Sequence, residues 1–266
     1  MRIYTNVAAI NAHRNLFLND VAMGKTMEKL SSGLRVDDAA GLAISEKMRA
    51  QINGYNQALR NAQDGVSLLQ TAEGAMTEIH AMLQRMVTLA TQSANGTYDN
   101  TTDRNALQAE VNQLIAQIDQ IAGSTNFNGI NLLNSTTSIQ LQIGANVADT
   151  LTFSLANATS TALGLGSLSI ATQSAANAAI TTLRNAINLV SSARARFGAV
   201  QNRLEHTINN LGVTAENLSA SESRIRDADM AYEMTQFIRN QILVQAGTAM
   251  LAQANAVPQN VLRLLG

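Results

Sequence analysis

The sequence contains no cysteine, no tryptophan and only one proline in 266 residues. Without cysteine the chain can form neither a disulfide framework nor a thiolate metal site. Aromatic residues make up only 3% of the chain, whereas large compact cores usually rely on aromatic side chains for bulk. Helix-forming residues with almost no proline instead favour long, thin helical packing.

The sequence also lacks a charge imbalance and a long hydrophobic run. Its net charge is -1 and its pI is near 6.3, which gives no reason to expect nucleic acid or an anionic membrane as a partner. No window has the roughly 18 mostly apolar residues of a membrane helix. The N-terminal segment is too polar for the apolar region of a signal peptide. We therefore expect no membrane insertion and, if the protein is secreted, no cleaved signal peptide.

Three stretches carry apolar residues at alternating steps of three and four. They run from Met48 to Ala90, from Leu107 to Ile121 and from Ile180 to Ile225. A seven-residue repeat held over such lengths places one narrow apolar stripe on each helix and favours packing against partner helices. The sequence therefore predicts a mainly α protein built as an elongated antiparallel bundle.

Between the second and third stretches the apolar period changes to two. Ile139, Leu141 and Ile143 alternate with glutamines, and residues 151–155 alternate in the same way. This pattern predicts a β-hairpin near residues 138–156 with one apolar face on the bundle. Residues 158–177 are small, polar and rich in turn formers, which indicates a loop with at most one short strand.

The C-terminal segment is unusual because it lacks charge. No residue from Asn240 to Leu262 is charged, yet seven of these 23 residues are Asn or Gln. A helix without charge on any side is usually buried on every side, and the N-terminal helix can cover only one side of it. We therefore expect both ends of the chain to pack against the same ends of other copies.

The residues predicted to mediate this self-assembly are large apolar side chains of the two terminal helices. They are Ile3, Val7, Ile10, Phe17, Val21, Met234, Phe237, Ile238, Ile242, Met250, Leu251, Val261, Leu262 and Leu265. The predicted domains are a discontinuous inner domain of residues 1–32 and 226–266, a connecting segment at 33–45, and a rod domain at 46–225.

No arrangement of residues indicates an enzyme. His13, His80 and His206 fall on three different predicted helices, without the spacing of metal ligands. The acidic residues at 37–38 and 227–229 are more typical of helix caps or solvated charges than of a catalytic pair. We expect no catalytic residue, no cofactor and no metal site.

Long, specific stretches lie in both halves of the chain. They include "MRIYTNVAAINAHRNL", "MEKLSSGLRVDDAAGLAISEKMRAQINGYNQALRNAQDGVSLLQTAEGAM", "ESRIRDADMAYEM" and "QAGTAMLAQANAVPQNVLRLLG". Together they resemble bacterial flagellin. The resemblance implies paired terminal helices that form a coiled-coil layer lining a filament channel, with a rod domain in the next layer. The short span between Asn126 and Thr172 implies a form without outer domains. One departure is that Val36 alone joins "SSGLR" to "DDAAGLAIS", a shorter link than the family usually has.

The resemblance also implies a function and a set of partners. It implies a structural subunit of the extracellular flagellar filament, exported unfolded through the flagellar secretion channel. The implied partners are other flagellin subunits, the export apparatus with its secretion chaperone, and the filament cap and junction proteins. Two alternatives remain open, a hook–filament junction protein and a non-flagellar helical signalling bundle, although the predicted hairpin argues against the latter.

A further implied site lies in "LQRMVTLATQSANG". In many flagellins this surface contacts the neighbouring subunit, and in the free monomer it is bound by the flagellin-sensing Toll-like receptor. Arg85, Leu89 and Gln92, with Glu110 on the adjacent helix, match that pattern. We expect Arg85, Leu89 and Gln92 to face outward and Val87 to face the core.

Overall fold

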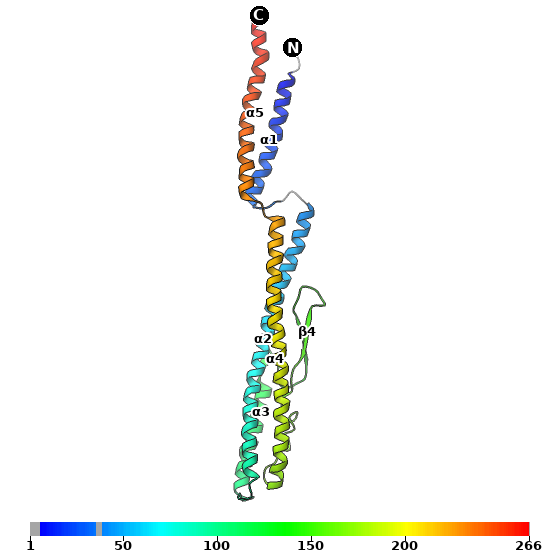
Figure 1. Ribbon diagram of the computed structural model, residues 1–266, viewed down its shortest axis with the longest axis vertical. Helices are drawn as coiled ribbons and strands as arrows, with labels where there is room; N and C mark the ends of the chain where they lie inside the picture. The colour runs from blue at the N-terminus through cyan, green and yellow to red at the C-terminus, as the bar shows by residue number, and fades with distance from the viewer. Residues whose placement is uncertain (1–5, 36–38, 266) are drawn as a thin grey trace. The chain divides into compact units, whose positions relative to one another are not determined.

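The computed structural model describes residues 6–35 and 39–265, and of Ala39 and residues 257–265 it describes the backbone alone (Figure 1). Ile3, Val36 and the predicted acidic cap at 37–38 lie outside the described residues. The helices are α1 (Val7–Ser32), α2 (Ala39–Ser93), α3 (Asp103–Ser124), α4 (Gln173–Arg226) and α5 (Met230–Leu265). The prediction of a mainly α protein with a hairpin is confirmed, and α2 begins early enough to include the second half of the predicted connecting segment.

The chain divides into two compact units. The terminal unit comprises Met1–Ala50 together with Asn217–Gly266, and the central unit comprises Gln51–Glu216. The boundaries between the units fall inside α2 and inside α4.

The central unit is held together by one hydrophobic core, to which α2, α3 and α4 all contribute. The predicted stripes supply much of it, because Leu69 and Leu83 of α2, Ile118 of α3, and Leu183 and Leu204 of α4 are all fully or almost fully buried. Aliphatic side chains at helical spacing therefore suffice for a thin core with few aromatic residues.

The predicted hairpin is formed by β3 (Ser138–Gln142) and β4 (Thr150–Ser154), which pair antiparallel. Ile139 faces Phe153 and Leu141 faces Leu151 across the two strands. These four side chains pack on the core of the central unit. The hairpin approaches α2 so closely that a Cβ at Gly65 would lie 2.4 Å from Leu141 Cδ1.

A second, smaller sheet lies between the second helical stretch and the predicted hairpin, where the sequence pattern predicted no strand. Strands β1 (Asn126–Phe127) and β2 (Ile130–Asn131) pair through a turn at Asn128 and Gly129. Both turn residues have positive φ, 49° and 82°, and Asn-Gly favours this kind of two-residue hairpin turn. The signal for it was therefore present in the sequence.

The segment that follows the hairpin contains turns and no strand among its described residues 155–172. Although its composition is small and polar, it contributes several buried side chains to the core. They are Leu155, Ala156, Ala158, Leu163, Leu165 and Ile170. The segment thus contributes to the core beside the helices, where the sequence indicated a loop with at most one short strand.

In the terminal unit, α1 and α5 run antiparallel (Figure 1). Asn6 caps the start of α1 by accepting a hydrogen bond from the Ala9 backbone N–H at 3.1 Å. Gly33 ends the helix with φ 71°, the left-handed conformation that glycine adopts at little cost. Asp229 caps α5, because its carboxylate accepts from the backbone N–H groups of Ala231 and Tyr232 at 3.0 and 3.1 Å.

In this unit the segment that follows α1 pairs with the segment that follows α4. Leu34 and Asp227 form an antiparallel bridge, and the Arg35 N–H donates to the Arg226 carbonyl at 2.7 Å. The Arg35 guanidinium also donates to the last carbonyls of α4, those of Arg224 and Ile225. A cation is favourable there because helix C-termini carry partial negative charge.

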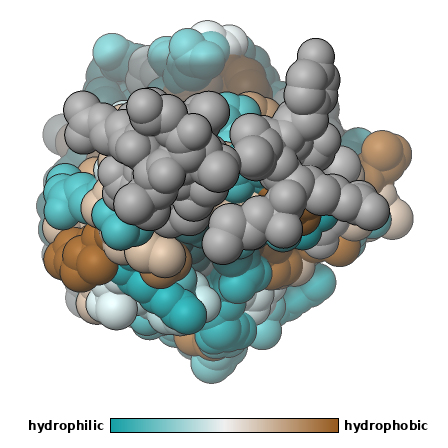
Figure 2. All heavy atoms as spheres, turned by 90° about the horizontal axis from the view of Figure 1, so that it is seen from above, coloured by the Kyte–Doolittle hydropathy of each residue, from teal (hydrophilic) through white to brown (hydrophobic). Residues whose placement is uncertain are grey.

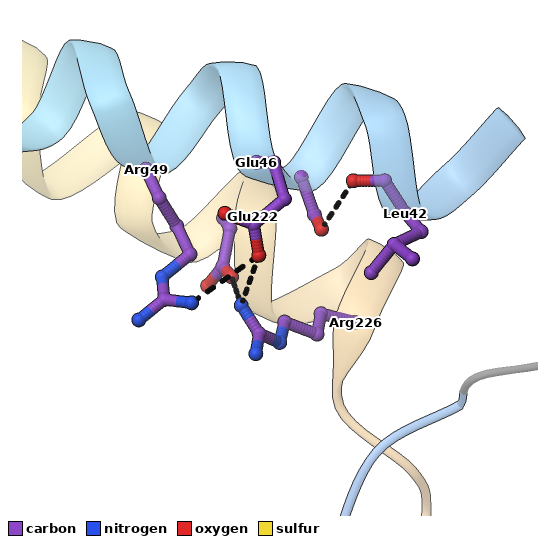
Figure 3. A network of polar contacts seen from close by, with 6 residues as sticks. Leu42, Glu46, Arg49, Glu222 and Arg226 are labelled. Atoms are coloured by element: carbon purple, nitrogen blue, oxygen red, sulfur yellow. Dashed lines mark hydrogen bonds and ion pairs between the residues drawn. The ribbon is translucent and has the colours of Figure 1, made fainter. Parts of the chain in front are cut away.

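Charged side chains tie the start of α2 to the end of α4 (Figure 3). The Arg226 guanidinium lies 3.4 Å from the Glu46 carboxylate and 3.5 Å from that of Glu222. Arg49 reaches the same Glu46 oxygen at 3.4 Å. The network joins residues that are about 180 positions apart in sequence. It lies next to the paired segments that follow α1 and α4.

Candidate functional site

The terminal unit exposes most of the large hydrophobic side chains that lie on the surface of the described chain. Phe17, for example, is 62% exposed. In Figure 2, hydrophobic side chains lie at the surface among hydrophilic ones. The exposed apolar residues of α1 and α5 are Val7, Ile10, Phe17, Leu18, Val21, Met27, Met230, Tyr232, Met234, Ile238, Ile242, Leu243 and Met250.

This unit has no buried apolar core among its described residues. Its buried side chains are those of Thr26, Ser45 and Glu233, which are all polar. Two paired helices can cover only one side of each other, so the remaining apolar side chains face water. A large exposed apolar surface of this kind marks a protein–protein interaction site.

The structure places the predicted assembly residues as follows. Val7, Ile10, Phe17, Val21, Met234, Ile238, Ile242 and Met250 are exposed, and Phe237 and Leu251 are half-buried. Ile3 lies outside the described residues, as do the side chains of Val261, Leu262 and Leu265. The exposed positions are available for contacts with another protein surface.

Contacts between α1 and α5 define the register of the pair. The Lys29 ammonium lies 3.6 Å from the Glu233 carboxylate, and their side chains are only 17% and 9% exposed. Further along, a Cβ at Gly247 would lie 3.1 Å from Leu16 Cδ1. No sequence pattern pointed to these contacts, although a basic residue in the last turn of α1 and an acidic residue in the first turn of α5 suit the helix dipoles.

The second candidate surface lies on α2 and α3 of the central unit. Arg85 Nε donates to Glu110 Oε1 at 2.8 Å, and the two side chains are 57% and 42% exposed. The hydrogen bond and the charge of Glu110 raise the pKa of Arg85 above its ordinary value. Gln92 is also exposed, and its amide donates to the Tyr98 hydroxyl at 3.0 Å. Three of the four predicted residues therefore lie on the surface.

The prediction that Leu89 faces outward was wrong, because Leu89 is only 1% exposed. Met86 and Ala90 beside it are also buried, while Val87 is half-buried against the core. The heptad stripe assumed that one side of α2 is covered. At this level α2 contributes to a core shared with α3, α4 and the segment after the hairpin, so more than one stripe is buried.

The turn between α2 and α3 is organised by a buried arginine that the sequence analysis missed. Arg104 is buried, and its guanidinium donates to the carbonyls of Ser93 and Asn95, each at 2.8 Å. Ser93 is the last residue of α2 and Asn95 lies in the turn just after it, where the end of a helix leaves carbonyl acceptors without intrahelical donors. The arginine thus satisfies the helix terminus and is itself hydrogen-bonded.

Asp99 in the same turn gives a pH-dependent prediction. Its carboxylate accepts from the Thr101 hydroxyl and from the backbone N–H groups of Thr101 and Thr102, which lowers the pKa of Asp99 below its ordinary 3.8. The ionised carboxylate stabilises the turn at pH values above the ordinary pKa. This stabilisation is lost as the pH falls through the lowered pKa. We expect the NMR signals of the Thr101 and Thr102 amides to titrate with a midpoint below 3.8, and Asp99→Asn to abolish the titration. A midpoint at or above 3.8 would contradict these hydrogen bonds.

Two further features bear on the class of protein. Among the residues that the structure describes, no helix is long and apolar enough to span a membrane. No group of three or more metal-ligating side chains lies close enough together within the same residues to hold an ion.

The fold and its uncovered helix pair define a helical structural subunit with a large apolar surface for protein–protein contacts. Comparison with known proteins agrees with this class. The model of the bacterial flagellin N-terminal helical region matches residues 3–138, and that of the C-terminal helical region matches residues 180–265. The chain belongs to the bacterial flagellin family.

Individual relatives extend over the whole chain. A flagellin from Bacillus subtilis is 50% identical over 303 residues, and a flagellar filament 33 kDa core protein from Treponema phagedenis is 48% identical over 286 residues; each match covers all of both chains. The crystal structure of Bacillus cereus flagellin is 39% identical, with a TM-score of 0.52, and the match covers 61% of this chain and 94% of that one. The described residues between α3 and α4 hold only the two small sheets and the turn-rich segment, so this is a short form without outer domains.

Proposed function

We propose that the chain polymerises into the bacterial flagellar filament and that the α1–α5 pair forms the inner layer by packing against the same pair in other copies. The observation that carries this proposal is the exposed apolar surface of a unit with no buried apolar core among its described residues. Burial of this surface between copies supplies the driving force for assembly. The Asn and Gln side chains of α5 can hydrogen-bond inside such an assembly without the desolvation penalty of a charge.

The surface around Arg85 and Glu110 is the second proposed contact between copies. An exposed ion pair adds little affinity, but an arginine at an interface can set the orientation of a partner. The flagellin-sensing Toll-like receptor would use the same surface in the free monomer. Because Leu89 is buried, that contact would rest on Arg85, Gln92 and Glu110.

Export and capping follow from the same assignment. The chain would pass unfolded through the flagellar secretion channel, with the export apparatus and a secretion chaperone as partners, and would meet the junction and cap proteins at the ends of the filament. A chain without cysteine cannot form a disulfide before or during that passage. The two units would fold after export, and the filament would therefore lie outside the cell.

Seeded polymerisation tests the proposal. We expect the full-length chain to elongate filament seeds into long tubes, as followed by sedimentation and electron microscopy. A fragment of residues 33–225 keeps the buried core of the central unit and lacks α1 and α5, so it should fold but fail to elongate seeds. Equal elongation by the fragment would show that the terminal helices are not the polymerisation device. Short rings in place of tubes would favour the junction-protein alternative.

A further inference from the structure

The side chain of Asn6 bridges the two terminal helices. Its amide nitrogen donates to the Ala254 carbonyl of α5 at 2.8 Å, and its amide oxygen accepts from the Ala9 N–H of α1 at 3.1 Å. One side chain therefore caps α1 and at the same time holds α5. The capping role needs only an acceptor, whereas the bond to α5 needs an N–H donor of the amide.

The Ala254 carbonyl is a special acceptor for a reason that is visible in the sequence. In an α-helix the carbonyl of each residue accepts from the N–H four residues later. For Ala254 that residue is Pro258, and proline has no N–H to donate. Helix α5 nevertheless continues through Pro258 to Leu265, so the Ala254 carbonyl lies within a helix without its helical donor.

We propose that Asn6 is a positioning residue that recognises this carbonyl and thereby sets the register of α1 on α5. Pro258 is the single proline of the sequence, so only one carbonyl within α5 loses its donor in this way. If α1 slipped by one helical turn, about 5.4 Å, Asn6 would meet a carbonyl that already accepts a helical bond. The hydrogen bond therefore distinguishes one register from the neighbouring ones. Apolar contacts alone distinguish them poorly, because they are not directional.

The position of Asn6 in the pair supports this role. The Lys29–Glu233 ion pair lies at one end of the α1–α5 contact and the Leu16–Gly247 approach near its middle, while Asn6 meets α5 beyond them at the other end. The ion pair has long flexible side chains and a separation of 3.6 Å, so it tolerates small shifts. The short amide at Asn6 is the more discriminating contact, because a hydrogen bond weakens steeply away from its ideal geometry.

The experiment is a double-mutant cycle in the full-length chain, with the critical concentration for seeded polymerisation as the readout. This readout rests on the proposed function. Asn6→Asp keeps the capping oxygen and the shape of the side chain but removes the donor. We expect it to raise the critical concentration roughly threefold to tenfold, the range for one lost hydrogen bond. Pro258→Ala restores the N–H that the Ala254 carbonyl lacks.

In the Pro258→Ala chain, Asn6→Asp is expected to change the critical concentration by less than about twofold, because the helix then satisfies the carbonyl itself. Asn6→Ala, which also removes the helix cap, should raise the critical concentration in both backgrounds. An equal effect of Asn6→Asp in the two backgrounds would overturn the proposal, since it would mean that Asn6 acts only through its cap or through the added charge. So would the absence of any effect in the chain that keeps Pro258.

Failure of the inference is distinguishable from failure of the proposed function. If the unsubstituted chain does not elongate seeds, the filament proposal fails, whatever the variants do. The double-mutant cycle is then measured by amide hydrogen exchange of α1 in the monomer. A loss of protection on Asn6→Asp that is larger in the chain with Pro258 than in the Pro258→Ala chain supports the inference. Equal losses in the two backgrounds overturn it. None of the three substitutions lies in the central unit, and far-UV circular dichroism of every variant checks that the chain still folds.

Discussion

Replacing Phe17 with aspartate is expected to raise the critical concentration for seeded polymerisation by at least about a hundredfold. Phe17 is 62% exposed on α1 in the single chain and would be covered by other copies in the filament. The substitution removes apolar area from that contact and places an unpaired carboxylate in it, and burial of an unpaired charge is strongly unfavourable. Sedimentation of filaments after seeding measures the effect.

The matched control at the same position is Phe17→Leu, which keeps an apolar side chain and should polymerise within a few-fold of the unsubstituted chain. Neither substitution should alter the thermal unfolding of the central unit, since Phe17 belongs to the terminal unit. If Phe17→Asp elongated seeds normally, Phe17 would face solvent in the filament, and the proposed inner-layer packing of α1 would be wrong.

Leu89→Ala is expected to lower the free energy of unfolding of the monomer by about 2–5 kcal/mol. Its side chain is 1% exposed within the shared core of α2, α3 and α4, so truncation leaves a cavity that the neighbouring helices fill only in part. Arg85→Ala, one turn away on the exposed side of α2, should leave the free energy of unfolding nearly unchanged, because an exposed ion pair contributes little to stability. Urea unfolding of both variants measures the difference.

The same two variants separate a surface contact from a structural effect. If the Arg85 surface contacts another copy or the receptor, Arg85→Ala weakens polymerisation or receptor signalling while the monomer stays as stable as before. Leu89→Ala should affect these readouts only through stability, so lowering the temperature should restore them. An Arg85→Ala monomer that signals as strongly as the unsubstituted chain would eliminate the receptor contact, and a stable Leu89→Ala chain would contradict its buried position.

The sequence predicted the parts of the fold that depend on periodicity. The stripes through Leu83 and Leu204 are long enough to identify α2 and α4 and the sides that they bury, and the alternation at Ile139 and Leu141 identifies β3. In each case the side that a residue occupies follows from its spacing alone. The apolar residues of α1 and of the first part of α5 were also identified from helical spacing, whereas the need for other copies to cover them was inferred from a different signal, the absence of charge from Asn240 to Leu262.

The remaining features depend on neighbours that a single sequence does not reveal. Leu89 falls off the main stripe, and only the presence of several packed layers makes it a core residue. Arg104 looks like an ordinary surface arginine until the turn brings the carbonyls of Ser93 and Asn95 to it. The Asn6 bond joins residues 248 positions apart, although the orphaned carbonyl at Ala254 could have been inferred from Pro258.

The pairing of α1 with α5 also has a consequence for protein synthesis. Of the described helices, the ribosome makes α1 first and α5 last, and the two form the main helix–helix contact of the terminal unit as the structure describes it. Under the proposed packing, a chain whose translation stops before α5 would lack the pair, even with its central unit folded. Such a chain would not join the filament, so assembly itself would select the chains that carry both helices.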